Sequence, residues 1–124
     1  MIRNLLLVGL GGGLGTIARF ACQKWFADYH PTHFPWGTFL VNITGCLLIG
    51  IFWGITLKSF PANESWKLFL MTGICGGFTT FSAFTLESMT LLKEQKTGLF
   101  FSYIAASILL GIMATYAGMK LSRL

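Results

Sequence analysis

Four long hydrophobic runs follow one another along the chain, separated by short polar segments. The runs cover residues 4–26, 34–57, 66–92 and 98–119. A helix needs roughly 20 apolar residues to cross the hydrocarbon core of a bilayer, so each run is long enough to span a membrane. The segments near 28–34, 58–65 and 93–97 are too short for a further domain. We therefore predict one all-α membrane domain over residues 1–124, with four antiparallel transmembrane helices.

The composition agrees with a multi-pass membrane protein. Of 124 residues, 54% are hydrophobic and 10% are charged, whereas soluble domains carry about 25% charged residues. The basic residues are scattered and mostly flank the hydrophobic runs, as interfacial anchors do. The net charge of +5 therefore does not indicate nucleic-acid binding. Cys22, Cys46 and Cys75 lie in apolar stretches and lack the spacing of a metal site.

The distribution of positive charge only weakly favours one orientation in the membrane. With four spans, one side carries five basic residues and the other three or four, depending on whether Arg19 reaches outward. The first group is Arg3, Lys58, Lys67, Lys120 and Arg123, and the second is Lys24, Lys93 and Lys96. So small a bias permits insertion in both orientations. The chain has no internal repeat, and two antiparallel copies would supply the symmetry that many transporters obtain from inverted repeats.

Small residues recur at intervals of four in these runs. The pairs are Gly9 and Gly13, Gly11 and Gly15, Gly50 and Gly54, and Gly73 and Gly77. Glycines at this spacing share one helix face and let two helix backbones approach closely. They predict tight helix packing and do not identify a transported substance.

The third run contains a segment that disfavours a continuous helix. Gly76 and Gly77 are followed, after one phenylalanine, by Thr79 and Thr80, and both residue types are poor helix formers. Irregular backbone is tolerated in the bilayer where it is buried in protein or lines a water-filled site. We expect the third helix to be broken near its middle, at the paired glycines; the alternative is a kink. Carbonyls freed at such a break are ligands for a cation such as sodium.

Two phenylalanines follow this segment. Phe81 and Phe84 are three residues apart, so they share a face if the helix resumes. An aromatic pair at this spacing is typical of a helix core or a lipid-facing surface. The alternative is an anion site, because the edge of an aromatic ring is positive. Such an edge attracts an anion without the full charge that would trap it, which suits conduction.

Polar side chains also occur inside the second and fourth runs. Asn42 lies midway along the second run, one turn after Thr38, and a buried amide needs hydrogen-bond partners. It either bonds a neighbouring helix or donates an N–H to a dehydrated anion. In the fourth run, positions four residues apart carry hydroxyl side chains, except that Gly111 occupies one of these positions. The hydroxyls serve either helix packing or a polar track. They belong to Tyr103, Ser107 and Thr115.

Three motifs, in order, resemble those of the CrcB/Fluc family of fluoride channels, small bacterial proteins of four spans. The motifs are Gly11-Gly-Gly-Leu-Gly15-Thr-Ile-Ala-Arg19, Gly37-Thr-Phe-Leu-Val-Asn42-Ile-Thr-Gly45, and Gly76-Gly-Phe-Thr-Thr-Phe-Ser-Ala-Phe84 followed by Glu87. The resemblance covers nearly the whole chain. It implies an antiparallel, dual-topology homodimer in a bacterial plasma (inner) membrane, with two pores that passively export cytoplasmic fluoride.

The resemblance also implies roles for single residues. Phe81 and Phe84 would form the aromatic box of the pore, and Asn42 would donate to fluoride. Gly76 and Thr79 would offer backbone oxygens from both subunits to one structural sodium ion. The other implied pore residues carry hydroxyls and are Thr38, Tyr103, Ser107 and Thr115. Arg19 would lie near the vestibule, where its charge would attract anions. Related sequences often have serine where this chain has Gly111, so the resemblance does not imply a continuous hydroxyl track here.

Other function classes fit the sequence less well. A small proton-coupled multidrug exporter also has four spans, but it needs an acidic residue within a span. The first run has none, and Glu87 lies near the end of the third run, where we expect water to solvate it. A non-transporting accessory subunit would use the glycine faces and carry no ion flux. We do not expect an enzyme, because no nucleophile and base occur at usable spacing. The expected partners are a second copy of the chain, lipid and fluoride.

Overall fold

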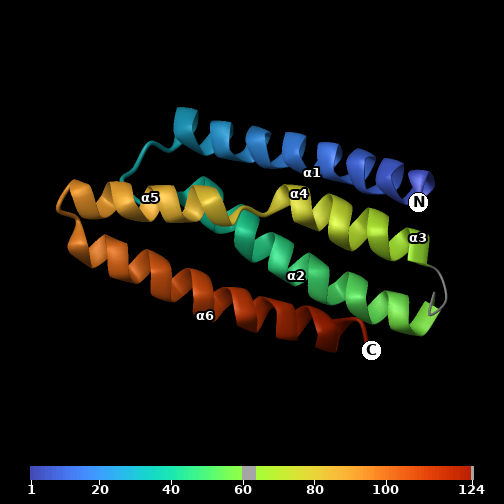
Figure 1. Ribbon diagram of the computed structural model, residues 1–124. Coiled ribbons are helices and arrows are strands. Elements are labelled where there is room, and N and C mark those ends of the chain that lie inside the picture. The colour runs from blue at the N-terminus through green and yellow to red at the C-terminus, as the bar shows by residue number, and fades with distance from the viewer. Residues whose placement is uncertain (60–63, 124) are drawn as a thin grey trace.

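The computed structural model describes residues 1–59 and 64–123, and its helices form four antiparallel spans (Figure 1). Three spans are single helices: α1 (Ile2–Tyr29), α2 (Trp36–Ser59) and α6 (Thr97–Leu121). The third span consists of α3 (Glu64–Lys67), the π-helical segment η1 (Leu68–Cys75), α4 (Gly76–Phe78) and α5 (Phe81–Lys93). Each predicted run therefore forms a span, longer than predicted at most ends. The predicted segment 58–65 falls partly outside the described residues.

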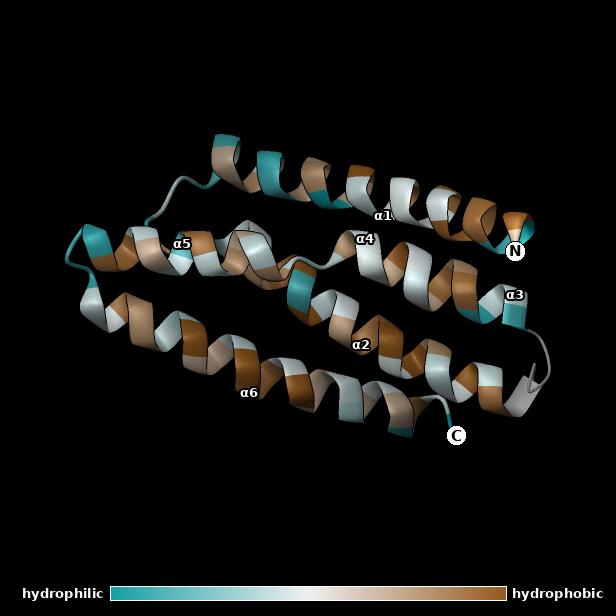
Figure 2. Ribbon diagram, in the orientation of Figure 1, coloured by the Kyte–Doolittle hydropathy of each residue, from teal (hydrophilic) through white to brown (hydrophobic). Residues whose placement is uncertain are grey.

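The surface of these helices is suited to lipid. All four spans are long and apolar enough to cross a membrane, and large aliphatic side chains such as Ile17 (68% exposed) and Ile112 (67% exposed) point outward. Figure 2 shows hydrophobic residues along every span and hydrophilic residues gathered near the ends of α1, α3 and α5. A protein in water with this much exposed apolar surface would be prone to aggregate. The predicted four-span membrane fold is therefore confirmed.

Close backbone contacts between helices explain several of the glycines. A Cβ atom on Gly15 would overlap the Ile74 carbonyl oxygen, and one on Gly118 would overlap the Leu47 carbonyl oxygen. The first contact joins α1 to the third span, and the second joins α6 to α2. A Cβ on Gly9, by contrast, would meet nothing within 4 Å. Glycine thus fixes two helix pairs by removing the side chain from their contact lines.

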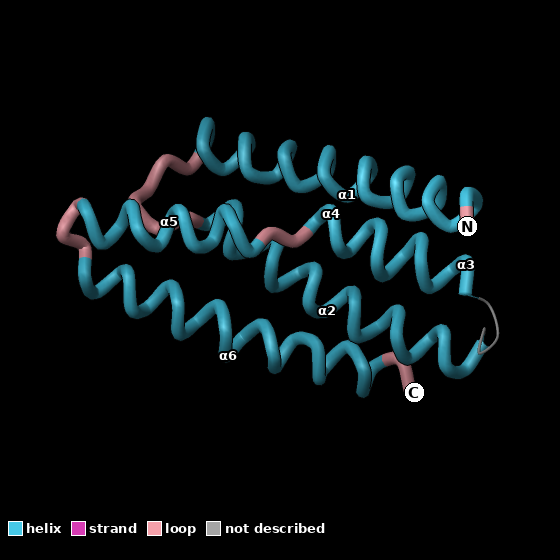
Figure 3. The backbone as a smooth tube through the Cα atoms, in the orientation of Figure 1, coloured by secondary structure: helices cyan, strands magenta, loops and turns pink. Residues whose placement is uncertain are grey.

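The third span is broken two residues beyond the predicted position. Thr79 (φ −89°, ψ 157°) and Thr80 (φ −150°, ψ 121°) are extended, and Figure 3 shows this stretch as a loop between α4 and α5. The prediction of a break at the paired glycines was wrong, because Gly76 is helical (φ −63°, ψ −39°). Gly77 instead permits contact with α1, since its Cβ would overlap the Gly12 carbonyl oxygen. The β-branched threonines favour the extended conformation.

We expect Gly15→Ala to lower the free energy of unfolding by about 1–3 kcal/mol, because the added methyl group overpacks a backbone contact. Gly9→Ala is the matched control on the same helix, and it should be neutral or stabilise by up to about 1 kcal/mol through helix propensity. Thermal unfolding of the purified protein in detergent measures both. Equal behaviour of the two variants would contradict the assigned packing of α1.

Candidate functional site

The break is held by one side chain from the neighbouring span. Asn42 Nδ2 donates to the Thr80 carbonyl oxygen (3.1 Å), and Asn42 Oδ1 accepts from the Thr80 backbone N–H (2.8 Å). The amide thus pairs with both backbone groups of one extended residue. A buried backbone group without a partner is costly, so Asn42 makes this extended backbone tolerable. Gly45 on the same helix supplies room, because its Cβ would overlap the Thr79 methyl group.

The break removes the donors that a continuous helix would provide to the carbonyl oxygens of this stretch, including those of Gly76 and Thr79. In such a helix the N–H of residue i donates to the carbonyl of residue i−4. The Thr80 N–H donates to Asn42 instead of Gly76. The Ala83 N–H donates to Thr80 Oγ1 (3.2 Å) instead of the Thr79 carbonyl. The carbonyls of Gly76 and Thr79 are therefore available as ligands, as the prediction for these two residues requires.

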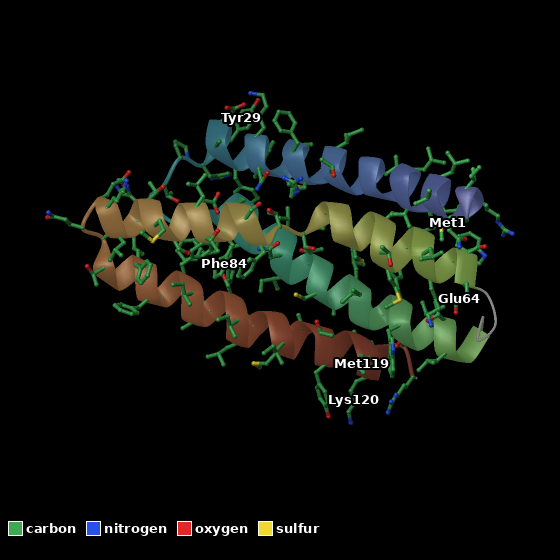
Figure 4. All side chains as sticks on the ribbon, in the orientation of Figure 1. Met1, Tyr29, Glu64, Phe84, Met119 and Lys120 are labelled. Carbon is green, nitrogen blue, oxygen red and sulfur yellow. The ribbon has the colours of Figure 1, made fainter. Side chains whose placement is uncertain are left out.

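A cavity of about 360 Å³ opens beside these carbonyls. It is bounded by α2, the broken third span and α6, and none of its lining residues is charged. Six of the predicted site residues line it: Asn42, Gly76, Thr79, Phe81, Phe84 and Ser107. Figure 4 shows Phe84 among the side chains between α5 and α6. The structure thus brings the predicted sodium ligands, the aromatic pair and two polar donors to one site.

The two phenylalanines are placed differently. Phe84 is 9% exposed, and its ring lies 5.1 Å from the Tyr103 ring in an edge arrangement. Phe81 is 76% exposed, with its ring 5.8 Å from that of Phe84. The pair therefore reaches from the protein interior to an uncovered surface in mid-membrane. A single chain leaves this side of the cavity open.

The hydroxyl residues of α6 differ in whether their proton is free. The Tyr103 hydroxyl donates to Glu87 Oε1 (3.0 Å), and the Thr115 hydroxyl donates to the Cys46 carbonyl oxygen (3.0 Å). Ser107 Oγ is buried and has no hydrogen-bond partner in the described part of the chain. A hydroxyl has one proton to donate. Of these three residues, Ser107 is therefore the one whose hydroxyl proton is not given to another described residue, and Ser107 also lines the cavity.

A second cavity of about 580 Å³ continues along α6 from the first. Ser107 and Cys46 line both cavities, and Gly111 and Thr115 line the second. A Cβ on Gly111 would meet the Cys46 sulfur at 3.4 Å, so this position adds width and no polar atom. Ser107, Gly111 and Thr115 of the predicted stripe thus lie along a cavity, whereas Tyr103 does not, and the stripe contributes one free donor proton.

A separate polar network includes residues whose importance the sequence did not reveal. The Thr38 hydroxyl donates to Glu87 Oε2 (2.8 Å) and accepts from Gln23 Nε2 (2.9 Å). Gln23 Oε1 in turn accepts from Arg19 Nη1 (3.5 Å). Glu87 is half-buried and also accepts from Tyr103, so two hydroxyls bind a carboxylate that the sequence placed near the interface. Gln23 gave one signal, a polar side chain four residues after Arg19.

This network lies outside the first cavity. Thr38, Gln23 and Glu87 line a smaller cavity of about 170 Å³ toward the loop between α1 and α2. Arg19 Nε meanwhile donates to the Gly77 carbonyl oxygen (3.0 Å). Thr38, Tyr103 and Arg19 therefore do not line the cavity at the break, although the Tyr103 ring packs against Phe84, which does.

Comparison with known proteins agrees with this arrangement. The family model described as "CrcB-like protein, Camphor Resistance (CrcB)" matches residues 6–119. The chain belongs to the CrcB family. Among curated members, a protein of Phocaeicola vulgatus is 45% identical over 121 residues, covering 98% of this chain and 99% of that protein. A protein of Azotobacter vinelandii is 43% identical over 124 residues and covers both chains fully.

The curated names of these relatives point to one activity. Both are named fluoride-specific ion channel FluC, as is a Flavobacterium psychrophilum protein that is 42% identical over 122 residues, 98% of each chain. The resemblance found in the sequence is thereby confirmed. The family is one of ion channels and not of enzymes, in agreement with the prediction for this chain.

Replacing Asn42 tests the architecture of the break. Asn42→Ala leaves the Thr80 N–H and carbonyl without their partner, and we expect a loss of about 1–3 kcal/mol in the free energy of unfolding. The amide of Thr80 should also exchange its hydrogen faster. Thr44→Ala, an exposed position on the same helix, is the control and should match the wild type in both measurements. Unchanged exchange at Thr80 in the Asn42 variant would contradict the assignment.

Proposed function

We propose that this protein is a passive, fluoride-selective ion channel whose pathway runs through the cavity at the helix break. The observation that supports this most strongly is the set of groups lining the cavity. Asn42 has a second N–H beyond the one given to Thr80, Ser107 has a free hydroxyl proton, and Phe81 and Phe84 offer ring edges. All of these attract an anion, and none carries a full charge.

The chemistry of fluoride fits such a lining. Fluoride is small and holds its water tightly, so a pore must replace that water with donors and positive ring edges. A lysine or arginine at the same place would bind the anion too firmly to release it. Conduction requires binding that is favourable enough for entry and weak enough for exit. The uncharged cavity meets both requirements.

The proposed assembly is an antiparallel, dual-topology homodimer. Its support is the open side of the cavity, where Phe81 is 76% exposed in a span that would lie in lipid. A second copy would cover this side, and the weak charge bias permits the opposite orientation. We place the protein in a bacterial plasma (inner) membrane, where a passive fluoride pathway would release cytoplasmic fluoride.

A central sodium ion would suit the freed carbonyls of this assembly. The Gly76 and Thr79 oxygens lack their helical donors and line the cavity, and unwound backbone carbonyls coordinate sodium in membrane transporters. One chain offers two such oxygens, and two copies would offer four. The positive charge of a bound ion would offset the partial negative charge of these carbonyls.

The alternative of a proton-coupled exporter rests on Glu87. This carboxylate is half-buried within the third span and accepts hydrogen bonds from two hydroxyls, and exporters of this kind need an intramembrane acid. Its position outside the cavity of Phe81, Phe84 and Ser107 favours a channel. A flux measurement separates the two functions, because exchange requires a proton gradient.

The decisive experiment is ion efflux from liposomes that contain the purified protein. We expect fluoride to leave rapidly in response to its own gradient, with chloride retained and with no need for an imposed proton gradient. Empty liposomes loaded with the same salts are the control. Fluoride movement that stops when the proton gradient is removed would support the exporter, and absence of any flux would support an accessory subunit.

Two serine and threonine variants test the pathway within the protein. Ser107→Ala removes the free donor and should slow fluoride efflux by roughly ten-fold, because hydrogen bonds to charged groups contribute about 1.5–3 kcal/mol. Thr115→Ala, two positions further along the same helical stripe, removes a hydroxyl whose proton is already donated to the Cys46 carbonyl and should have a smaller effect. Efflux that is slowed equally by the two substitutions would contradict the distinction between free and engaged hydroxyls.

A further inference from the structure

Arg19 contacts the broken span from the side that faces away from the cavity. It is half-buried on α1, and its Nε donates to the Gly77 carbonyl oxygen at 3.0 Å. Gly77 packs against Gly12 of α1, whereas its neighbours Gly76 and Thr79 line the cavity. The guanidinium group therefore binds a carbonyl that lies, along the chain, between the freed carbonyls of Gly76 and Thr79.

The hydrogen bond from Arg19 to the Gly77 carbonyl compensates for a donor that is lost at the end of a helix. The helical stretch from Glu64 to Phe78 ends at the break, and the carbonyl end of a helix carries partial negative charge. In an unbroken helix the Gly77 carbonyl would accept from the N–H of residue 81. Arg19 replaces that donor with a charged one, and charge-assisted hydrogen bonds are short and strong.

A second bond fixes the direction of the guanidinium group. Arg19 Nη1 donates to Gln23 Oε1 at 3.5 Å, and Gln23 is held in turn by Thr38. Within residues 1–59 and 64–123, the ion pair present joins Lys24 to Asp28, so no carboxylate draws Arg19 away from the carbonyl. The planar fork of arginine suits two acceptors in a fixed geometry, which lysine does not reproduce.

We propose that Arg19 is a positioning residue for the cation site, and that it acts by anchoring the Gly77 carbonyl so that the Gly76 and Thr79 carbonyls face the cavity. This inference rests on the proposed function, in which those two carbonyls hold sodium. It differs from the vestibule role predicted from the sequence, where the charge of Arg19 would attract anions from solution. The two roles make opposite predictions for Arg19→Lys, which keeps the positive charge and loses the planar fork of N–H donors.

The test is the sodium dependence of Arg19→Gln, Arg19→Lys and the control Arg3→Gln. Arg3 is also on α1 and bonds the third span, but at its beginning, through Ser65 (2.6 Å). Each protein is prepared throughout in N-methyl-D-glucamine buffer and titrated with sodium chloride. Fluoride efflux from liposomes and the thermal unfolding temperature in detergent are both measured. Unfolding provides a result that does not depend on conduction.

We expect both Arg19 variants to need about ten-fold more sodium than the wild type for half-maximal efflux and for thermal stabilisation, through loss of a charge-assisted hydrogen bond. Arg3→Gln should follow the wild type. A variant that is too unstable without sodium to be purified, but recovers at high sodium, also supports the proposal.

Two results would overturn the inference while leaving the channel intact. One is a wild-type sodium midpoint in Arg19→Gln. The other is full recovery of efflux and of the midpoint in Arg19→Lys, which would assign Arg19 to attraction of anions by charge. If the wild type itself shows no response to sodium in either measurement, the sodium site of the proposed function fails, and the role of Arg19 fails with it.

Discussion

The pairing of the Asn42 amide with the backbone of Thr80 is the interaction on which the rest of the site depends. A helix break in mid-membrane exposes polar backbone where no water is available to satisfy it. One side chain that both donates to the Thr80 carbonyl and accepts from its N–H removes that cost. Because the pairing ends α4 and lets α5 begin, it also decides which carbonyls are left for a ligand.

The site that results combines two opposite requirements in a small space. The freed carbonyls of Gly76 and Thr79 would suit a cation, while the N–H, O–H and ring edges of other lining residues would suit an anion. The cavity can contain both kinds of group without a charged residue, because the nearby charged side chains form hydrogen bonds outside it. Arg19 is bound to Gly77 and Glu87 to two hydroxyls. Arg19 thus binds the backbone and Glu87 binds side chains, and neither residue lines the cavity.

Residues that look alike in the sequence differ in the hydrogen bonds that their side chains make. Tyr103, Ser107 and Thr115 recur at equal spacing on α6, yet the protons of the first and last are donated to protein acceptors. Thr38 is likewise engaged with Glu87. A hydroxyl whose proton is already donated still accepts hydrogen bonds, but it cannot donate to an anion without breaking the existing hydrogen bond. The proposed pathway therefore contains fewer free donors than the number of polar residues suggests.

The sequence by itself determined the four spans, the membrane setting and the family, because apolar length and local motifs are properties of contiguous residues. It also indicated that the third span would not be a continuous helix. Only the tertiary structure decided where the break falls, because the contact of Gly77 with α1 keeps the glycines helical. It also decided that two hydroxyls donate to Glu87 and that Arg19 binds a carbonyl. These outcomes depend on hydrogen bonds between residues 38, 49 and 58 positions apart, and such distant pairings leave no periodic trace in a single sequence.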